Sequence, residues 1–128
     1  MKKVVSIALF GERYTEYAKY LPAFVRAHLN IFPDWKLIIH CDRRYDPPFI
    51  HRFYATGLVS IVTRDPAMLC TSMLWRMSPV FPGFAEDAEY VFCRDIDSLP
   101  MPRDRAAMEW FINSGATTHT IHDNEMHV

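Results

Sequence analysis

The sequence predicts an α/β protein with a Rossmann-like, mainly parallel sheet and helices on both faces. Short apolar, β-rich runs alternate with segments of helical periodicity from one end of the chain to the other, which is typical of repeated strand–helix units. The first run, from Val4 to Phe10, is almost continuously apolar, as expected for a strand whose two faces are both covered. The 128 residues, half of them hydrophobic, can bury one core, so we expect a single domain over residues 1–128.

The first half of the chain contains two further strand candidates and at least one helix. Residues from Tyr14 to Ile31 show helical periodicity, and Pro22 must either kink this segment or begin a second helix at its first turn. Trp35 to His40 and Leu58 to Val62 are predicted strands, and Phe49 to Thr56 between them is a candidate short helix.

The second half repeats the alternation. Asp65 followed by Pro66 predicts a helix start, and this helix extends to about Met77. Tyr90 to Cys93 is the fourth predicted strand, and Thr117 to Ile121 alternates like a fifth. A further helix begins at Pro102 or Asp104 and ends at Gly115, and four of its residues are expected to face the core: Ala106, Ala107, Trp110 and Phe111.

Two acids, Asp95 and Asp97, follow the fourth predicted strand directly and precede Pro100. Side chains two residues apart on a strand point to one face, so these carboxylates are expected to project together, roughly 6–7 Å apart along the backbone. Ligands of open α/β sheets bind at this carboxyl end of the strands. A Mn²⁺ or Mg²⁺ ion would offset the repulsion between the carboxylates, about 4 kcal/mol at 4 Å and an effective dielectric constant of 20. The alternative is a solvated turn in which Asp97 or Ser98 caps the next segment.

In its order of elements from residue 3 to about residue 122, the chain resembles the N-terminal, donor-binding part of GT-A-type glycosyltransferases. Arg94-Asp95-Ile96-Asp97-Ser98 stands where that family carries its DxD motif. The resemblance implies metal-dependent transfer of a sugar from a nucleotide diphosphate donor to a carbohydrate or other hydroxyl acceptor. It also implies that Asp97 binds the metal directly and that Asp95 contacts the ribose, or the metal through water. Family members continue further, so we expect a C-terminal truncation or a partner chain that completes the site.

The resemblance suggests further donor-binding residues. Phe10, Gly11 and Tyr14 stand where the family places its nucleotide-contacting loop, although a core Phe and a surface Tyr explain them nearly as well. Asp42 ends the second strand and could accept hydrogen bonds from the base, or close a turn on its own backbone. Arg76 stands on the helix where the family often carries a basic residue that reaches the diphosphate or the donor sugar, and a guanidinium matches phosphate oxygens bidentately. The alternative for Arg76 is a solvent-facing side chain whose stem covers the neighbouring tryptophan.

The C-terminal tail contains three histidines and two acids, and it matches no familiar metal-binding spacing. Asp123 or Glu125 could be the general base of an inverting transferase. A polar chain end without a site is the alternative.

Composition excludes several classes. The formal charge is −1 and no long Lys/Arg block occurs, so a nucleic-acid partner is not expected. The three cysteines are far apart and lie in or beside apolar runs, which favours reduced thiols and a cytoplasmic location. No apolar run approaches the ~20 residues of a membrane span. The four glycines form neither a G-x-G-x-x-G fingerprint nor a P-loop.

Two other functions fit parts of the pattern. An aspartyl-phosphate phosphohydrolase also uses two acids one residue apart, but there the pair typically follows the first strand and precedes a threonine. A non-catalytic fragment or subunit that binds a nucleotide-sugar would need the same acids and no acceptor site.

Overall fold

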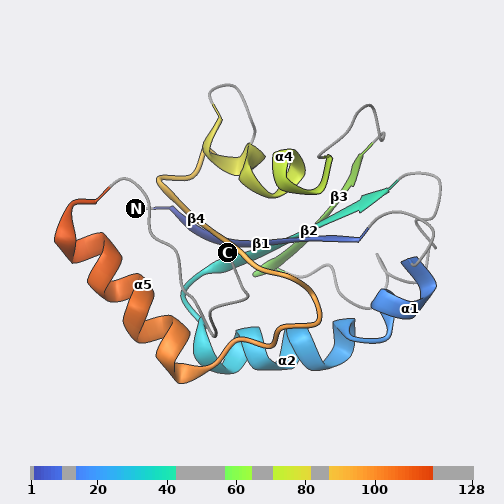
Figure 1. Ribbon diagram of the computed structural model, residues 1–128, viewed down its shortest axis with the longest axis horizontal. Coiled ribbons are helices and arrows are strands. Elements are labelled where there is room, and N and C mark those ends of the chain that lie inside the picture. Colours follow the sequence, from blue (N-terminus) through green and yellow to red (C-terminus); the bar gives the residue numbers. More distant parts are fainter. Residues whose placement is uncertain (1, 10–13, 43–56, 65–70, 82–86, 117–128) are drawn as a thin grey trace, which may run out of the picture.

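The computed structural model describes residues 2–9, 14–42, 57–64, 71–81 and 87–116. Within these residues one parallel sheet has the strand order β3-β2-β1-β4 (Figure 1). Its strands are β1 (Lys3–Leu9), β2 (Lys36–Asp42), β3 (Val59–Arg64) and β4 (Tyr90–Cys93). The order reverses at β1, which pairs with β2 on one side and with β4 on the other.

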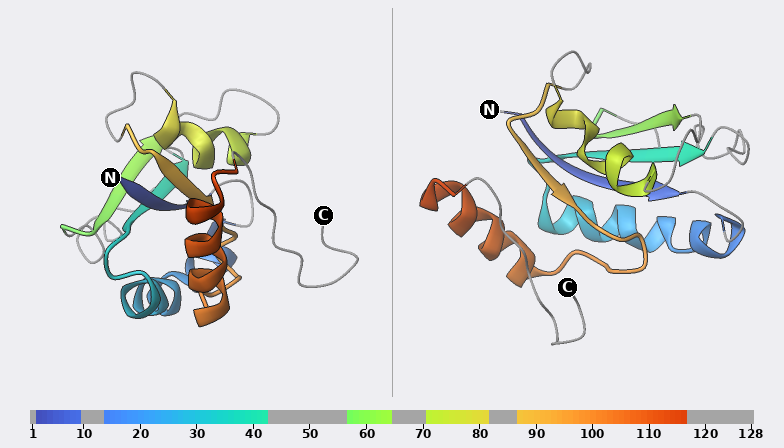
Figure 2. Two further views of the ribbon diagram at one scale, coloured as in Figure 1. Left: turned by 90° about the vertical axis from the view of Figure 1, so that its left-hand side faces the viewer. Right: turned by 45° about the horizontal axis from the view of Figure 1, so that its top comes forward.

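Helices cover both faces of this sheet. On one face lie α4 (Thr71–Met77) and the short 3-10 helix η1 (Ser78–Val80). The other face carries α1 (Tyr14–Ala18), α2 (Leu21–Ile31) and α5 (Pro102–Ser114). Figure 2 shows the same three layers from two further directions, with α2 and α5 on the side opposite α4. The predicted Rossmann-like parallel sheet with helices on both faces is thereby confirmed.

The core lies mainly between the sheet and α2, because alternate residues of the central strands point to that face. Val5, Ile7 and Leu9 of β1 are at most 1% exposed and pack in one cluster with Phe24 of α2 and Trp35. A smaller apolar cluster on the α4 face contains Val4, Ile38 and Ala88. Burial of each large apolar side chain contributes about 1.5–3 kcal/mol, so these two clusters hold the three layers together.

Several boundaries differ from the sequence prediction. One open alternative is decided: Pro22 lies in the first turn of α2 and not in a kink, as one of the two expected outcomes has it, so the segment from Tyr14 is two helices. Strand β2 continues past His40 to Asp42, because Cys41 and Asp42 still pair with β3. A strand in a parallel sheet extends for as long as the neighbouring strand offers hydrogen-bonding partners. The local sequence around His40 does not show that β3 offers them.

The buried face of helix α5 was predicted only in part. Phe111 is buried as expected, but Trp110, also expected in the core, is 61% exposed, and Ala106 is exposed too. Asp104, Met108 and Phe111 are the buried residues of this helix, at a spacing of four and three. Gly115 follows the helix with φ 74°, which confirms it as the left-handed C-terminal stop.

Some predicted elements lie outside the described residues. They are the helix at Phe49–Thr56, the start of the helix at Pro66 and the strand at Thr117–Ile121. Among the helices that the structure does describe, none is both long and apolar enough to cross a bilayer.

Candidate functional site

The two acids lie in a tight turn and not on an extended strand end. Strand β4 ends at Cys93, and the Ser98 N–H donates to the Asp95 carbonyl at 3.0 Å, which closes the turn. The prediction that strand geometry aligns the two acids is therefore wrong in this detail. Ile96 between them is 5% exposed and packs in the main core cluster, whereas Asp95 and Asp97 are exposed. Because the Ile96 side chain points into the core, the carboxylates of Asp95 and Asp97 on either side of it point toward solvent.

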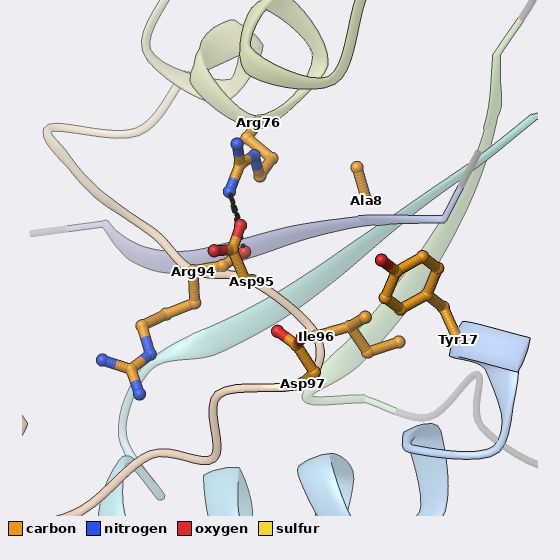
Figure 3. Close-up of a pocket in the computed structure, with 7 residues that line it drawn as sticks. All are labelled: Ala8, Tyr17, Arg76, Arg94, Asp95, Ile96 and Asp97. Carbon is orange, nitrogen blue, oxygen red and sulfur yellow. Dashed lines mark hydrogen bonds and ion pairs between the residues drawn. The ribbon is translucent and has the colours of Figure 1, made fainter. Parts of the chain in front are cut away.

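Both acids nevertheless line one pocket of about 380 Å³ (Figure 3). The other lining residues come from β1, α1, α4 and the acidic turn: Ala8, Tyr17, Arg76, Arg94 and Ile96. The pocket therefore lies at the carboxyl ends of β1 and β4, where the strand order reverses. In open α/β sheets this switch point is the position at which ligands bind.

Arg76, in the last turn of α4, points at the acidic turn. Its Nη1 donates to Asp95 Oδ1 at 2.9 Å and to the Arg94 carbonyl at 3.1 Å. The Arg76 side chain is 13% exposed and the Asp95 side chain is 68% exposed. The largely buried Arg76 guanidinium thus faces an exposed, solvated carboxylate, and its charge offsets part of the repulsion between Asp95 and Asp97.

Arg94 supports the acidic turn from the opposite side, and its guanidinium points away from Asp95 (Figure 3). Its Nη1 donates to Asp104 Oδ1 at 3.0 Å, and its Nη2 donates to the Ser98 and Leu99 carbonyls, both at 2.9 Å. We did not predict this role from the sequence. An arginine directly before the acids, with an aspartate at the start of the next helix, was the available signal.

The two carboxylates fit a hard divalent cation. Mg²⁺ and Mn²⁺ prefer oxygen ligands, commonly take one or two from carboxylates and complete the shell with water and phosphate oxygens. In the described part of the chain, no group of three or more His, Cys, Asp or Glu side chains could hold a metal. Water and substrate phosphate oxygens would complete the shell of an ion held by Asp95 and Asp97.

Asp42 lies at the carboxyl edge of the sheet, as predicted, but it is the last residue of β2 and is fully buried. Tyr14 is the first residue of α1, and its side chain is not among those described. The remaining predicted site residues lie outside the described residues: Phe10, Gly11, Asp123 and Glu125.

Tyr17 and Ala8 are pocket residues that we did not predict. The helical periodicity places Tyr17 on the core face of its helix, and it does pack against the main core cluster. It also reaches the pocket, because α1 lies beside the carboxyl end of β1. Ala8 lies near the end of β1, and its small side chain leaves room above the strand. The packing of α1 beside the end of β1 brings Tyr17 and Ala8 to the pocket, and the sequence alone does not show it.

A series of polar side chains linked by hydrogen bonds crosses the sheet beneath α4. Ser6 Oγ and His40 Nε2 lie 2.9 Å apart. Arg64 donates from Nε to His40 Nδ1 at 3.5 Å and from Nη2 to Ser78 Oγ at 3.0 Å. Burial, together with the charges of Arg64 and Arg76, lowers the pKa of His40 to about 3. His40 is therefore neutral at physiological pH, with its proton on the nitrogen that faces Ser6.

Comparisons of the chain with protein-family models, with curated proteins and with solved structures gave no match. The function is therefore inferred from the fold and from the residues that line the pocket.

Proposed function

We propose that the protein is a GT-A-type glycosyltransferase, or the donor-binding part of one, that uses a divalent metal and a nucleotide diphosphate sugar. The observation that carries this proposal is the pocket itself. It brings the carboxylates of Asp95 and Asp97 together with the Arg76 guanidinium at the switch point of a parallel sheet. Acceptors would be carbohydrates or other hydroxyl compounds.

The chemistry of donor cleavage explains why these residue types belong together. Negative charge builds on the departing diphosphate as the bond to the sugar breaks, and preorganised positive groups stabilise that charge. Arg76 is 13% exposed and held by the Arg94 carbonyl, so it is already oriented. A Mn²⁺ or Mg²⁺ ion at Asp95 and Asp97 would act as a Lewis acid toward the same phosphate oxygens. Asp97 would bind the ion directly, and Asp95 would bind it through water or contact the ribose.

The glycines support the need for such groups. Gly11, Gly57, Gly83 and Gly115 form no glycine-rich phosphate-binding motif in the sequence. In the proposed site, side chains and a metal ion would neutralise the phosphate charge. Asp123 and Glu125 remain candidates for the general base.

Cys41 and Cys93 are free thiols, which is in keeping with a cytoplasmic protein.

Calorimetric binding of nucleoside diphosphates tests the proposal. UDP, GDP and ADP are titrated into the protein with Mn²⁺ and, separately, with EDTA. We expect one of them to bind at least about tenfold more tightly with Mn²⁺, a difference of about 1.4 kcal/mol. Asp97→Ala should abolish this metal-dependent binding. Asp34→Ala is the matched control, because Asp34 is an ion-paired, half-exposed acid that does not line the pocket.

Equal binding with and without metal would contradict the proposal. Product analysis then separates the alternatives. Sugar transfer to an acceptor supports the transferase, whereas tight metal-dependent binding with only slow donor hydrolysis would indicate a nucleotide-sugar-binding fragment or subunit. Hydrolysis of a generic aryl phosphate would instead favour a phosphohydrolase.

A further inference from the structure

The Arg76–Asp95 ion pair engages a carboxylate oxygen that could otherwise face a cation in the pocket, directly or through water. Arg76 Nη1 lies 2.9 Å from Asp95 Oδ1, and both residues line the pocket together with Asp97. A divalent cation bound by Asp95 and Asp97 would therefore lie close to a guanidinium. Positive charges at such separations repel, so Arg76 opposes binding of the cation alone.

A diphosphate would reverse this effect. Its oxygens are better partners for a guanidinium than a single carboxylate oxygen, because they accept charge-assisted hydrogen bonds and carry more negative charge. With Arg76 facing phosphate, Asp95 can turn toward the cation.

The two side chains differ in freedom in the way that this exchange requires. Asp95 is 68% exposed, so rotation of its carboxylate costs little. Arg76 is 13% exposed, and its Nη1 also donates to the Arg94 carbonyl at 3.1 Å. That second bond keeps the guanidinium at the pocket when the carboxylate leaves.

We propose that Arg76 is an internal counter-ion of Asp95 that makes a divalent cation and a nucleoside diphosphate bind cooperatively at this pocket. This inference rests on the proposed function, and it adds a coupling between the two ligands. Cation binding without diphosphate is weakened by Arg76, and diphosphate binding without cation is weakened by Asp95. Each ligand relieves the obstacle to the other, so the coupling is reciprocal.

The test measures Mn²⁺ affinity by the electron paramagnetic resonance signal of the free ion, with and without the nucleoside diphosphate. Arg76→Gln should bind Mn²⁺ alone about threefold more tightly than the wild type, as expected for release of a partly solvated ion pair. The same variant should bind the diphosphate about tenfold more weakly at saturating Mn²⁺, since a charge-assisted bond is lost. Chelation of Mn²⁺ by the nucleotide in solution is identical for both proteins and cancels in the comparison.

Two further variants test whether the positive charge of Arg76 is responsible for these effects. Arg76→Lys keeps it and should leave the affinity for Mn²⁺ alone near the wild-type value. Arg105→Gln removes an arginine that pairs with Asp34 outside the pocket, and it should change neither affinity.

Asp95→Asn provides the reciprocal measurement and does not depend on the folding of Arg76 variants. In EDTA it should bind the diphosphate about threefold more tightly than the wild type, because the Asp95 carboxylate no longer competes with phosphate for Arg76. Unchanged or weaker Mn²⁺ binding by Arg76→Gln, or no gain in Asp95→Asn, would overturn the counter-ion role while leaving the proposed function intact. Failure of the wild type to bind any nucleoside diphosphate with Mn²⁺ would overturn both.

Discussion

The Arg94 guanidinium and the Asp104 carboxylate lie 3.0 Å apart and join the acidic turn to the N-terminus of α5. The Arg94 side chain is largely buried, with 11% of its surface exposed, and the Asp104 side chain is buried, with 5% exposed. Asp104 Oδ2 also accepts the Met101 N–H at 2.8 Å, so one carboxylate caps the helix and holds the arginine. The loop that carries Asp95 and Asp97 is thereby fixed from inside the protein.

Replacing Arg94 should therefore cost stability as well as binding. Arg94→Lys keeps the charge, but its single nitrogen cannot take the places of both Nη1, which donates to Asp104, and Nη2, which donates to the two carbonyls. We expect a loss of about 2–4 kcal/mol in the free energy of unfolding. Urea denaturation measures this loss. Arg105→Lys changes the half-exposed pair with Asp34 and should cost less than about 1 kcal/mol. Equal costs for the two variants would show that Arg94 does not hold the turn.

Ile96 tests whether the core orients the acids. It is 5% exposed and packs in the main cluster, so Ile96→Ala should lower the free energy of unfolding by about 2–4 kcal/mol, and Ile96→Val by about 1 kcal/mol. Because the turn loses its anchor, Ile96→Ala should also weaken Mn²⁺-dependent nucleotide binding at a temperature where it remains folded. Calorimetry on Ile96→Ala and Ile96→Val measures both effects. Unaltered binding in Ile96→Ala would mean that hydrogen bonds alone position Asp95 and Asp97.

Ala8 tests whether the pocket is the binding site. Ala8→Val places two additional methyl groups beside the pocket and suits a strand, so stability should change by less than about 1.5 kcal/mol. We expect the affinity for the nucleoside diphosphate with Mn²⁺ to fall about tenfold, from lost space. Ala106→Val, on the exposed face of α5, is the matched control and should leave the affinity unchanged. Wild-type affinity in Ala8→Val would place the ligand elsewhere.

Stability should fall on mild acidification because buried histidines are held neutral. Burial lowers the pKa of His28, and it lowers the pKa of His40 from 6.5 to about 3. The unfolded chain then binds more protons than the folded one, so the contribution of His40 is complete above pH 6.5 and is lost as the pH falls toward 3. Each pH unit in this range should cost up to about 1.4 kcal/mol for this residue.

Urea unfolding at several pH values between about 7.5 and 4.5 measures this slope. His40→Gln should flatten it, even where it lowers the stability at neutral pH. The Asp34 carboxyl does not interfere, because its hydrogen bond with Arg105 lowers its pKa below 3.8, outside this range. An unchanged slope in His40→Gln would show that other groups govern acid sensitivity.

Local sequence signals predicted the fold well where one element determines its own structure. The run Tyr90–Cys93 is the fourth strand as expected, and Gly115 ends α5 as expected. The buried face of α5 was predicted only in part: Phe111 is buried as expected, whereas Trp110 was placed in the core and is exposed. Asp104 is buried there because Arg94 pairs with it, and that partner lies ten residues earlier, directly after β4. A helical periodicity cannot show which face finds such a partner.

The sequence by itself determined a parallel α/β sheet with two acids directly after its fourth strand, because apolar runs and their spacing are local properties. Only the tertiary structure decided that Arg76, nineteen residues before Asp95, reaches that carboxylate, and that Tyr17 and Ala8 line the same pocket. These residues meet because β4 pairs with β1 across the sheet while α4 and α1 cover opposite faces. Such contacts depend on register and packing between distant segments, which no short stretch of sequence encodes.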